Sequence, residues 1–261
     1  MDDADVEAVR ARLAVSRFRI KVIETGAGRV VAKRQRPHRS AWRARGVNVL
    51  ARAVGVPILQ AVPAHGGARA QRIEVERLRA LRAAGLRVPE VLHVDAAFIV
   101  ISHLDGRSLV ELIEAGGARG WDAWRQGLDA IAEVHARGQY LSHAFARNFL
   151  AAPGAALAMI DFEVDPLEVL SLDQAQARDW LAYLHSTLWL LEPSPATAPA
   201  VASRLATARP AVRAQIEAAG RRLAVLRHLP RSRRTWGREV AGVRALAAFF
   251  PLPSTSSSTA A

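Results

Sequence analysis

Segments that favour β-strands are concentrated up to about Ser102, and segments that favour helices make up most of the chain after it. Runs of apolar and β-branched residues at 18–23, 29–35 and 97–101 predict strands. Helical patterns at 4–16 and 70–84 accompany them. This order favours an α+β fold with two lobes, a small β-containing lobe over residues 1–102 and a helical lobe over 103–250.

The second part of the chain is expected to be helical except at 138–165, an irregular stretch with two short apolar runs. Asp105-Gly106 is a predicted turn, and Ser108 could cap a helix that begins at Leu109. Further helices are expected at 173–191, 200–207, 211–228 and 237–249. The tail at 251–261 is rich in Ser, Thr and Pro, and we expect it to be disordered.

Composition limits the class of protein. Hydrophobic residues make up 51% of the 261 residues, which indicates a globular protein. No apolar run reaches the roughly 18 residues that a membrane span needs. The N-terminal segment is acidic and does not resemble a signal peptide. Because the chain has no cysteine, disulfides and thiolate metal sites are excluded, which favours a cytoplasmic location.

The formal net charge of +12 would attract nucleic acid, an anionic membrane surface or a phosphorylated substrate. The alternative is that an Ala- and Arg-rich composition produces this charge without a function. Arginines cluster at 34–39, at 43 and 45, and at 231–234. Few aromatic residues lie among them, so a base-stacking surface for nucleic acid is not indicated.

Lys33 is one of only two lysines in the chain, and the other is Lys21. It ends the apolar run Arg29-Val30-Val31-Ala32-Lys33, which follows the turn Thr25-Gly26-Ala27-Gly28 and an earlier strand-like run. The pattern predicts a β-hairpin that presents a lysine at its inner end. Downstream, the helix pattern around Glu74 leads to Gly85, a good helix stop, and then to Val88-Pro89.

Three later segments carry chemistry-bearing residues in a regular order. The strand-like run at 98–101 leads through Ser102-His103-Leu104 into the turn. The helix pattern at 131–137 ends in Val-His-Ala-Arg before Gly138, and Asn148 follows ten residues later. Asp161, in the run Met-Ile-Asp-Phe-Glu, follows thirteen residues after Asn148.

Over roughly residues 18–192, these segments resemble the small atypical kinases, especially the lipopolysaccharide-core sugar kinase family and the related RIO-like kinases. The resemblance implies a protein-kinase-like two-lobe fold that binds ATP and Mg²⁺. Lys33 would grip the ATP phosphates, and Glu74 would hold Lys33, with Glu76 as the other candidate. The backbone around Ser102 to Leu104 would hydrogen-bond adenine.

The same resemblance makes Asn148 and Asp161 the metal ligands, because a hard cation takes oxygen ligands. Asp179 would brace the catalytic loop by accepting backbone N–H bonds, and His135 has a structural role. Glu163 and Asp165 either form a turn, which the sequence favours, or add metal oxygens or contact a basic partner.

Two departures from the family pattern concern catalysis. His143 stands where the catalytic aspartate is expected, five residues before Asn148. A neutral imidazole can accept a proton, so His143 is either a substitute base or a sign that transfer is lost. The second departure is the missing glycine-rich phosphate loop, since the segment from Arg10 to Arg19 contains no glycine.

The resemblance favours an ATP-dependent phosphotransferase whose acceptor is a hydroxyl of a glycolipid, another small molecule or a protein. An anionic glycolipid at the inner face of the membrane would suit the positive charge. The first alternative is a pseudokinase, a regulatory or scaffolding module that keeps the fold without transfer. A second alternative, which the sequence favours less, is a nucleic-acid-binding protein that uses the arginine clusters.

Overall fold

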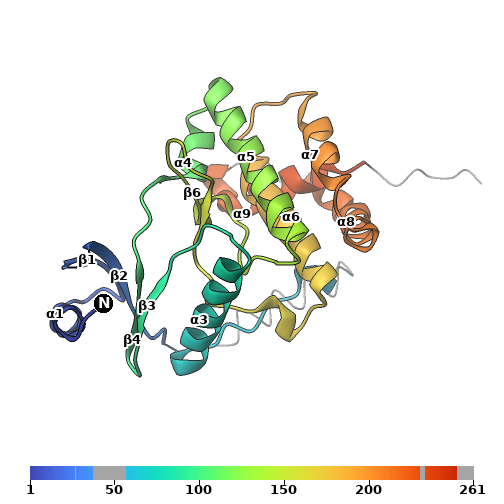
Figure 1. The fold of residues 1–261 in the computed structure, drawn as a ribbon. Coiled ribbons are helices and arrows are strands. Elements are labelled where there is room, and N and C mark those ends of the chain that lie inside the picture. The colour runs from blue at the N-terminus through green and yellow to red at the C-terminus, as the bar shows by residue number, and fades with distance from the viewer. Residues whose placement is uncertain (27, 38–56, 230–232, 252–261) are drawn as a thin grey trace, which may run out of the picture.

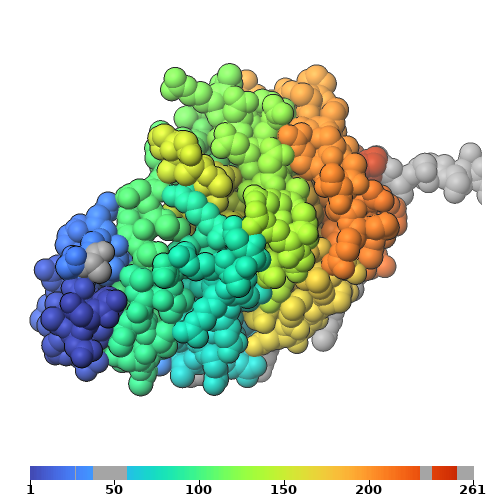
Figure 2. Space-filling view, in the orientation of Figure 1, coloured from blue at the N-terminus to red at the C-terminus, as the bar shows by residue number. Residues whose placement is uncertain are grey.

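A computed structural model describes residues 1–26, 28–37, 57–229 and 233–251. It has the α+β composition that the sequence predicts, with β-strands early and helices late (Figure 1). A helical pattern at 48–54, most of the arginines of the clusters at 34–45, and the tail from 252 lie outside the described residues. Figure 2 shows α1 (Asp3–Ala14) at one end of the molecule and helices of the second half at the other.

The early strands form one antiparallel sheet in the order β1-β2-β4-β3. Their bounds are Ile20–Thr25 for β1, Gly28–Arg34 for β2, Val91–Val94 for β3 and Phe98–Ser102 for β4. The predicted hairpin is β1–β2, and its register pairs Ile20 with Lys33 and Val22 with Val31. Because side chains alternate along a strand, these four residues share one face of the sheet.

The two faces of the sheet pack on different partners. On one face, buried Val30, Ala32 and Val100 form a small core with residues of α1, including Val9 and Leu13. On the other face, Ile99 and Ile101 join the main core, which contains residues of α3 (Gly67–Ala83) and of the later helices. The alternation therefore turns Lys33 away from α1 and toward α3.

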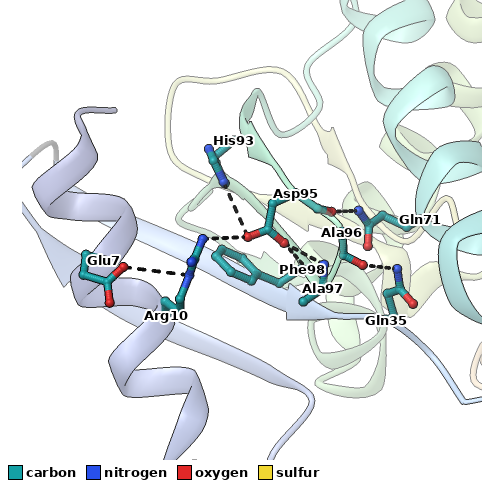
Figure 3. A network of polar contacts seen from close by, with 9 residues as sticks. All are labelled: Glu7, Arg10, Gln35, Gln71, His93, Asp95, Ala96, Ala97 and Phe98. Atoms are coloured by element: carbon teal, nitrogen blue, oxygen red, sulfur yellow. Dashed lines mark hydrogen bonds and ion pairs between the residues drawn. The ribbon is translucent and has the colours of Figure 1, made fainter.

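Polar contacts at the β3–β4 turn help to hold α1 against its face of the sheet (Figure 3). The Asp95 carboxylate accepts hydrogen bonds from the backbone N–H groups of Ala97 and Phe98 and pairs with Arg10 of α1 at 3.1 Å. Glu7, one helical turn before Arg10, lies 3.9 Å from its guanidinium. These contacts fix α1 as the outer cover of the sheet.

Helices dominate the second half, with a small sheet of three short strands in the order β5-β6-β7. The strands are β5 (Arg107–Ser108), β6 (Phe149–Ala151) and β7 (Ala158–Met159). The helices are α4 (Leu109–Glu114), α5 (Gly117–Ala136), α6 (Leu172–Thr187), α7 (Thr197–Leu205), α8 (Pro210–Leu223) and α9 (Arg233–Phe249), with single 3₁₀ turns at Pro57–Leu59, Ala146–Asn148, Pro166–Glu168 and Ala224–His228. Ser108 stands at the N-cap of α4, but its hydroxyl donates to the Arg147 carbonyl and does not cap the helix.

The long helices α5 and α6 pack through a buried polar contact. Tyr183 of α6 donates its hydroxyl to the Trp124 carbonyl of α5 at 2.8 Å, and the Trp124 indole N–H donates to Thr187 at 3.1 Å. All three residues are fully buried. These hydrogen bonds join α5 and α6 and satisfy the polar side-chain atoms of the three residues, which gives the loops beside the pair a rigid support.

Two glycines end the helices that lead into the site. Gly85 has φ of 76° after α3, and Gly138 has φ of 68° after α5. In both turns a backbone N–H past the glycine bonds back into the last helical turn, from Leu86 to Leu81 and from Gln139 to Val134, each at 3.0 Å. These are the left-handed helix stops for which glycine is suited.

The main core crosses the lobe boundary expected near Ser102. It joins α3 residues such as Leu78 to Trp124 of α5 and Trp180 of α6. The inner face of the sheet and the later helices are therefore continuous through one hydrophobic cluster. Within the described ranges, no helix is long and apolar enough to cross a membrane.

Candidate active-site cleft

A cleft of about 420 Å³ lies between the α3-facing side of the sheet and the segment around Asp161. This volume falls within the range of small-molecule sites, about 300–1,000 Å³. Its apolar walls come from both halves of the chain, with Val22, Val31 and Ile101 from the sheet and Leu150 and Ile160 from the second half. Its charged residues are Arg19, Lys33, Arg36, Glu74, Asp161 and Glu163.

Lys33 and Glu74 form a buried ion pair at the inner end of the cleft. The side chains are 8% and 4% exposed, respectively, whereas Glu76 is exposed and takes no part. Burial alone would lower the pKa of Lys33, but Glu74 and Glu163 outweigh it, and the pKa is raised. Lys33 is therefore a fixed positive charge in a largely dry site.

Glu163 is a second buried acid of the cleft and contacts three cations. Its Oε1 lies 2.7 Å from Arg19 and 3.4 Å from Lys33, and its Oε2 lies 3.0 Å from Arg36. Burial raises its pKa, but Lys33 and the two arginines outweigh that effect, so the pKa is lowered and the carboxylate stays ionised. The turn expected at Glu163 and Asp165 begins at Asp165, whose carboxylate accepts the Leu167 N–H at 2.9 Å, whereas Glu163 is buried in this cluster of cations.

Asp161 is the one non-glycine residue with positive φ, 72°, in the described part of the chain. Its carboxylate lines the cleft and makes no hydrogen bond or ion pair with any described residue. A strained backbone position and an unpaired carboxylate together mark a functional candidate. Phe162, which follows, is buried in the main core and anchors this segment.

Asn148 lies beside Asp161 through backbone pairing. The Ile160 N–H donates to the Asn148 carbonyl at 3.0 Å, next to the β6–β7 pair Phe149–Met159. The Asn148 side chain is buried, and its Nδ2 donates to the His143 carbonyl at 2.9 Å. That bond leaves the amide oxygen Oδ1 available as an acceptor.

Asp161 and Asn148 offer two oxygen donors of the kind that Mg²⁺ takes when a substrate phosphate and water complete its shell. No group of three His, Cys, Asp or Glu side chains able to hold a metal occurs among the described residues. The donor set thus fits a cation bound jointly with a phosphate ligand. It does not fit a cation bound by protein ligands alone.

His143 lies on the loop before β6 and does not line the cleft itself. Its ring stacks on Phe145 at 5.8 Å, and its Nδ1 is buried with no partner in the described structure. Burial lowers the pKa of His143, and the nearby Asp161 carboxylate opposes this effect. The imidazole is therefore neutral at neutral pH, with a nitrogen free to accept a proton.

Asp179 braces the loop that carries His143. It is fully buried on α6, accepts the Leu141 N–H at 2.8 Å and pairs with His135 Nε2 at 3.0 Å. This is the contact that the sequence resemblance implied for Asp179, and it gives His135 a structural partner. A second contact to the same loop comes from Arg77 of α3, which donates to the Tyr140 carbonyl at 2.8 Å.

The segment from Ser102 to Leu104 lies along the cleft wall. The Ser102 N–H donates to the Glu90 carbonyl at 2.8 Å, and the His103 N–H donates to the Arg29 carbonyl at 3.2 Å. For the Leu104 N–H, the described residues supply no hydrogen-bond partner. One backbone donor beside the apolar walls is thus free for a ligand.

Five of the seven residues singled out as site residues line the cleft, namely Lys33, Glu74, Ser102, Leu104 and Asp161. Asn148 and His143 lie behind it, linked to each other and to the Asp161 segment. Sequence reasoning did not single out Arg19, and it noted Arg36 only as a member of the arginine cluster at 34–39. The signal that could have found them is the combination of a missing glycine loop with arginines flanking both strands of the hairpin.

Comparison with known proteins adds no relative, since the chain matches no protein-family model and no curated protein.

Proposed function

We propose that this chain has a protein-kinase-like fold and is an ATP-dependent phosphotransferase. The observation that carries the proposal is the buried Lys33–Glu74 pair in the same cleft as the Asp161 carboxylate, which pairs with no described residue. Phosphoryl transfer requires a fixed cation for the phosphates and a metal ligand facing it. Lys33, Glu74 and Asp161 are far apart in the sequence. An ion pair with a purely structural role would not explain why all three meet in one cleft.

Adenine would occupy the apolar part of the cleft. Val22, Val31 and Leu150 supply flat apolar contacts of the kind that a purine ring needs. The free Leu104 N–H would donate to a ring nitrogen of adenine. The nucleotide would then run from Leu104 toward Lys33, with its phosphates at the charged end of the cleft.

Mg²⁺ would be held by the Asp161 carboxylate and the Asn148 amide oxygen. When bound, the cation supplies charge neutralisation for the transferred phosphate. The chain's own contribution is to hold Asp161 in its left-handed backbone conformation and Asn148 against the His143 loop. Both positions are fixed before any ligand binds, which lowers the entropic cost of binding.

His143 is the proposed base for the acceptor hydroxyl. Its lowered pKa keeps the imidazole neutral, and it takes the chain position of the expected aspartate. Since His143 lies behind the cleft, the acceptor would have to approach from the side of the 139–145 loop. The net charge of +12 suits an anionic acceptor, such as a glycolipid at the inner membrane face.

A pseudokinase is the second candidate, and one observation favours it. His143 does not line the cleft, and its Nδ1 is enclosed by the protein. A base that cannot reach the acceptor hydroxyl cannot transfer its proton. In that case the chain would bind nucleotide through Lys33 and Asp161 and act as a scaffold.

Isothermal titration calorimetry with Mg·ATP, followed by an ATP-turnover assay, tests both candidates. The phosphotransferase predicts saturable binding and slow hydrolysis or transfer that His143→Gln abolishes. The pseudokinase predicts binding without turnover in either protein. The absence of saturable ATP binding at millimolar concentration would reject the phosphotransferase and any pseudokinase that binds nucleotide.

A further inference from the structure

Three cations converge on the charged end of the cleft, and in the part of the chain that the structure describes two carboxylates contact them. Lys33 pairs with Glu74, and Glu163 is shared among Arg19, Lys33 and Arg36. With Asp161, which also acts on Lys33, the charged residues of the cleft are three of each sign, but Arg19 and Arg36 both share the single carboxylate of Glu163. Guanidinium N–H groups that a carboxylate does not use can bind a further anion.

Arg19 lies where a phosphate-covering loop would otherwise be. It immediately precedes β1, and the segment from Arg10 to Arg19 has no glycine. The Arg34 N–H donates to the Arg19 carbonyl at 2.9 Å, which extends the β1–β2 ladder past the Ile20–Lys33 pair. The ladder thus holds Arg19 next to the strand of Lys33.

Arg36 approaches the same point from the other side of Lys33. It follows the end of β2 and reaches Glu163 Oε2 at 3.0 Å. Arg19 and Arg36 line the cleft and remain 30% and 18% exposed, so part of each side chain is accessible to a ligand. A guanidinium has five N–H donors, and these contacts use few of them.

The Glu163 carboxylate is a resident anion in this cluster. Two guanidinium groups and an ammonium surround this one carboxylate. The same three groups can donate hydrogen bonds to the oxygens of a phosphate. One cation would be enough to balance the single negative charge of Glu163. The surplus of donors and their exposure point to a second anion.

We infer that Arg19 and Arg36, with Lys33, form a polyphosphate-binding site that replaces the missing glycine-rich loop, and that Glu163 occupies this site when no phosphate is bound. The inference rests on the proposed function in so far as the polyphosphate is that of a nucleotide. The site itself would bind an inorganic polyphosphate as well, because its donors contact only phosphate oxygens.

Glu163 therefore competes with the incoming phosphates. A bound triphosphate takes over the donors of Arg19 and Arg36, and the ionised Glu163 repels it. Removing the charge of Glu163 tightens polyphosphate binding, whereas removing the two arginines weakens it. Opposite effects from neighbouring residues distinguish this account from general damage to the fold.

Calorimetry with adenosine, ATP and inorganic tripolyphosphate, at two salt concentrations, tests the inference. The proteins are the wild type, Arg19→Gln/Arg36→Gln, Glu163→Gln and the control Arg17→Gln. Arg17 is exposed, lies two residues before Arg19 and does not line the cleft, so it removes one charge without touching the site.

The double arginine variant should bind ATP and tripolyphosphate about tenfold or more weakly, since two charge-assisted contacts are lost. Its adenosine affinity should not change, and Arg17→Gln should match the wild type. Glu163→Gln should bind tripolyphosphate more tightly, and a misfolded variant could not produce such a gain. The affinity for ATP and tripolyphosphate should depend less on salt concentration in the double variant than in the wild type.

The inference is overturned if the double variant loses adenosine and ATP affinity equally, or if wild-type protein does not bind tripolyphosphate. Wild-type binding of adenosine without any gain for ATP would also overturn it while leaving a nucleoside site intact. Wild-type binding of tripolyphosphate without adenosine would reject the proposed nucleotide function and support the polyphosphate site.

Discussion

The side-chain amide of Asn148 donates a 2.9 Å hydrogen bond to the backbone carbonyl of His143. This bond joins the candidate metal ligand to the loop that carries the candidate base. It also fixes which atom of the Asn148 amide remains for a cation, because Nδ2 is used and Oδ1 is not. A shift of the His143 loop would therefore also move Asn148, so the metal side and the acceptor side of the proposed site are coupled through this hydrogen bond.

Breaking the Lys33–Glu74 pair on one side should destabilise the protein strongly. Lys33→Met leaves Glu74 buried without its partner, which costs about 3–5 kcal/mol of unfolding free energy. The double variant Lys33→Met/Glu74→Gln should recover much of that loss. Urea denaturation of the four proteins in this cycle measures the coupling, and additive effects would contradict a direct buried pair.

Asp161→Gly should separate stability from function. Glycine tolerates φ of 72° without strain, so the unfolding free energy should rise by about 1 kcal/mol. The same change removes the carboxylate, so the Mg²⁺ dependence of ATP binding should disappear. Thermal unfolding and calorimetry with and without Mg²⁺ give the two readouts. A large loss of stability would show that Asp161 is a structural residue.

The pH dependence of turnover should report His143. Since burial lowers its pKa below the ordinary value of about 6.5, the base form persists to lower pH, and the acid limb of activity should lie below pH 6.5. His143→Gln should reduce turnover by about 100-fold or more while leaving the ATP Kd unchanged. Unchanged turnover in this variant would remove His143 from the mechanism.

The same group predicts a pH dependence of stability. His143 takes up a proton more readily in the unfolded chain than in the folded one, so unfolding binds a proton between the lowered folded pKa and about 6.5. Stability should fall as the pH drops through that window, and His143→Gln should reduce the slope. An equal slope in both proteins would assign the effect to other groups.

The Asp179 brace should be stronger than a surface pair on the same helix. Asp179→Ala leaves the Leu141 N–H and His135 without their acceptor, which should cost about 3 kcal/mol or more. Asp173→Ala, which breaks the exposed pair with Arg209, should cost less than about 1 kcal/mol. Faster amide exchange at Leu141 in the first variant alone would locate the effect in the loop.

How much the sequence could predict depends on the range of the interaction. The hairpin, the face of Lys33 and the ends of α3 and α5 follow from local patterns, namely strand alternation and two glycines. The choice of Glu74 over Glu76 depended on the family resemblance, and in the structure Glu74 is buried against Lys33 whereas Glu76 is exposed. The α+β class followed from the order of these segments, and the structure confirms it.

The rest depends on contacts between distant segments. Arg19 and Glu163 meet only because β1 lies over the Asp161 segment, and no local pattern indicates that approach. The position of His143 behind the cleft is likewise set by Asp179 and Asn148, which hold its loop from two sides. Spacing along the chain gave the order of these residues but not their depth in the fold.

The affinity for Mg·ATP of Lys33→Met compared with Lys21→Met tests the central claim most directly. Lys33 and Lys21 are the only lysines of the chain and lie on neighbouring strands, but Lys21 does not line the cleft. The account predicts saturable binding by the wild type, the same Kd for Lys21→Met, and a Kd at least tenfold higher for folded Lys33→Met. Equal affinity in the two variants would contradict it.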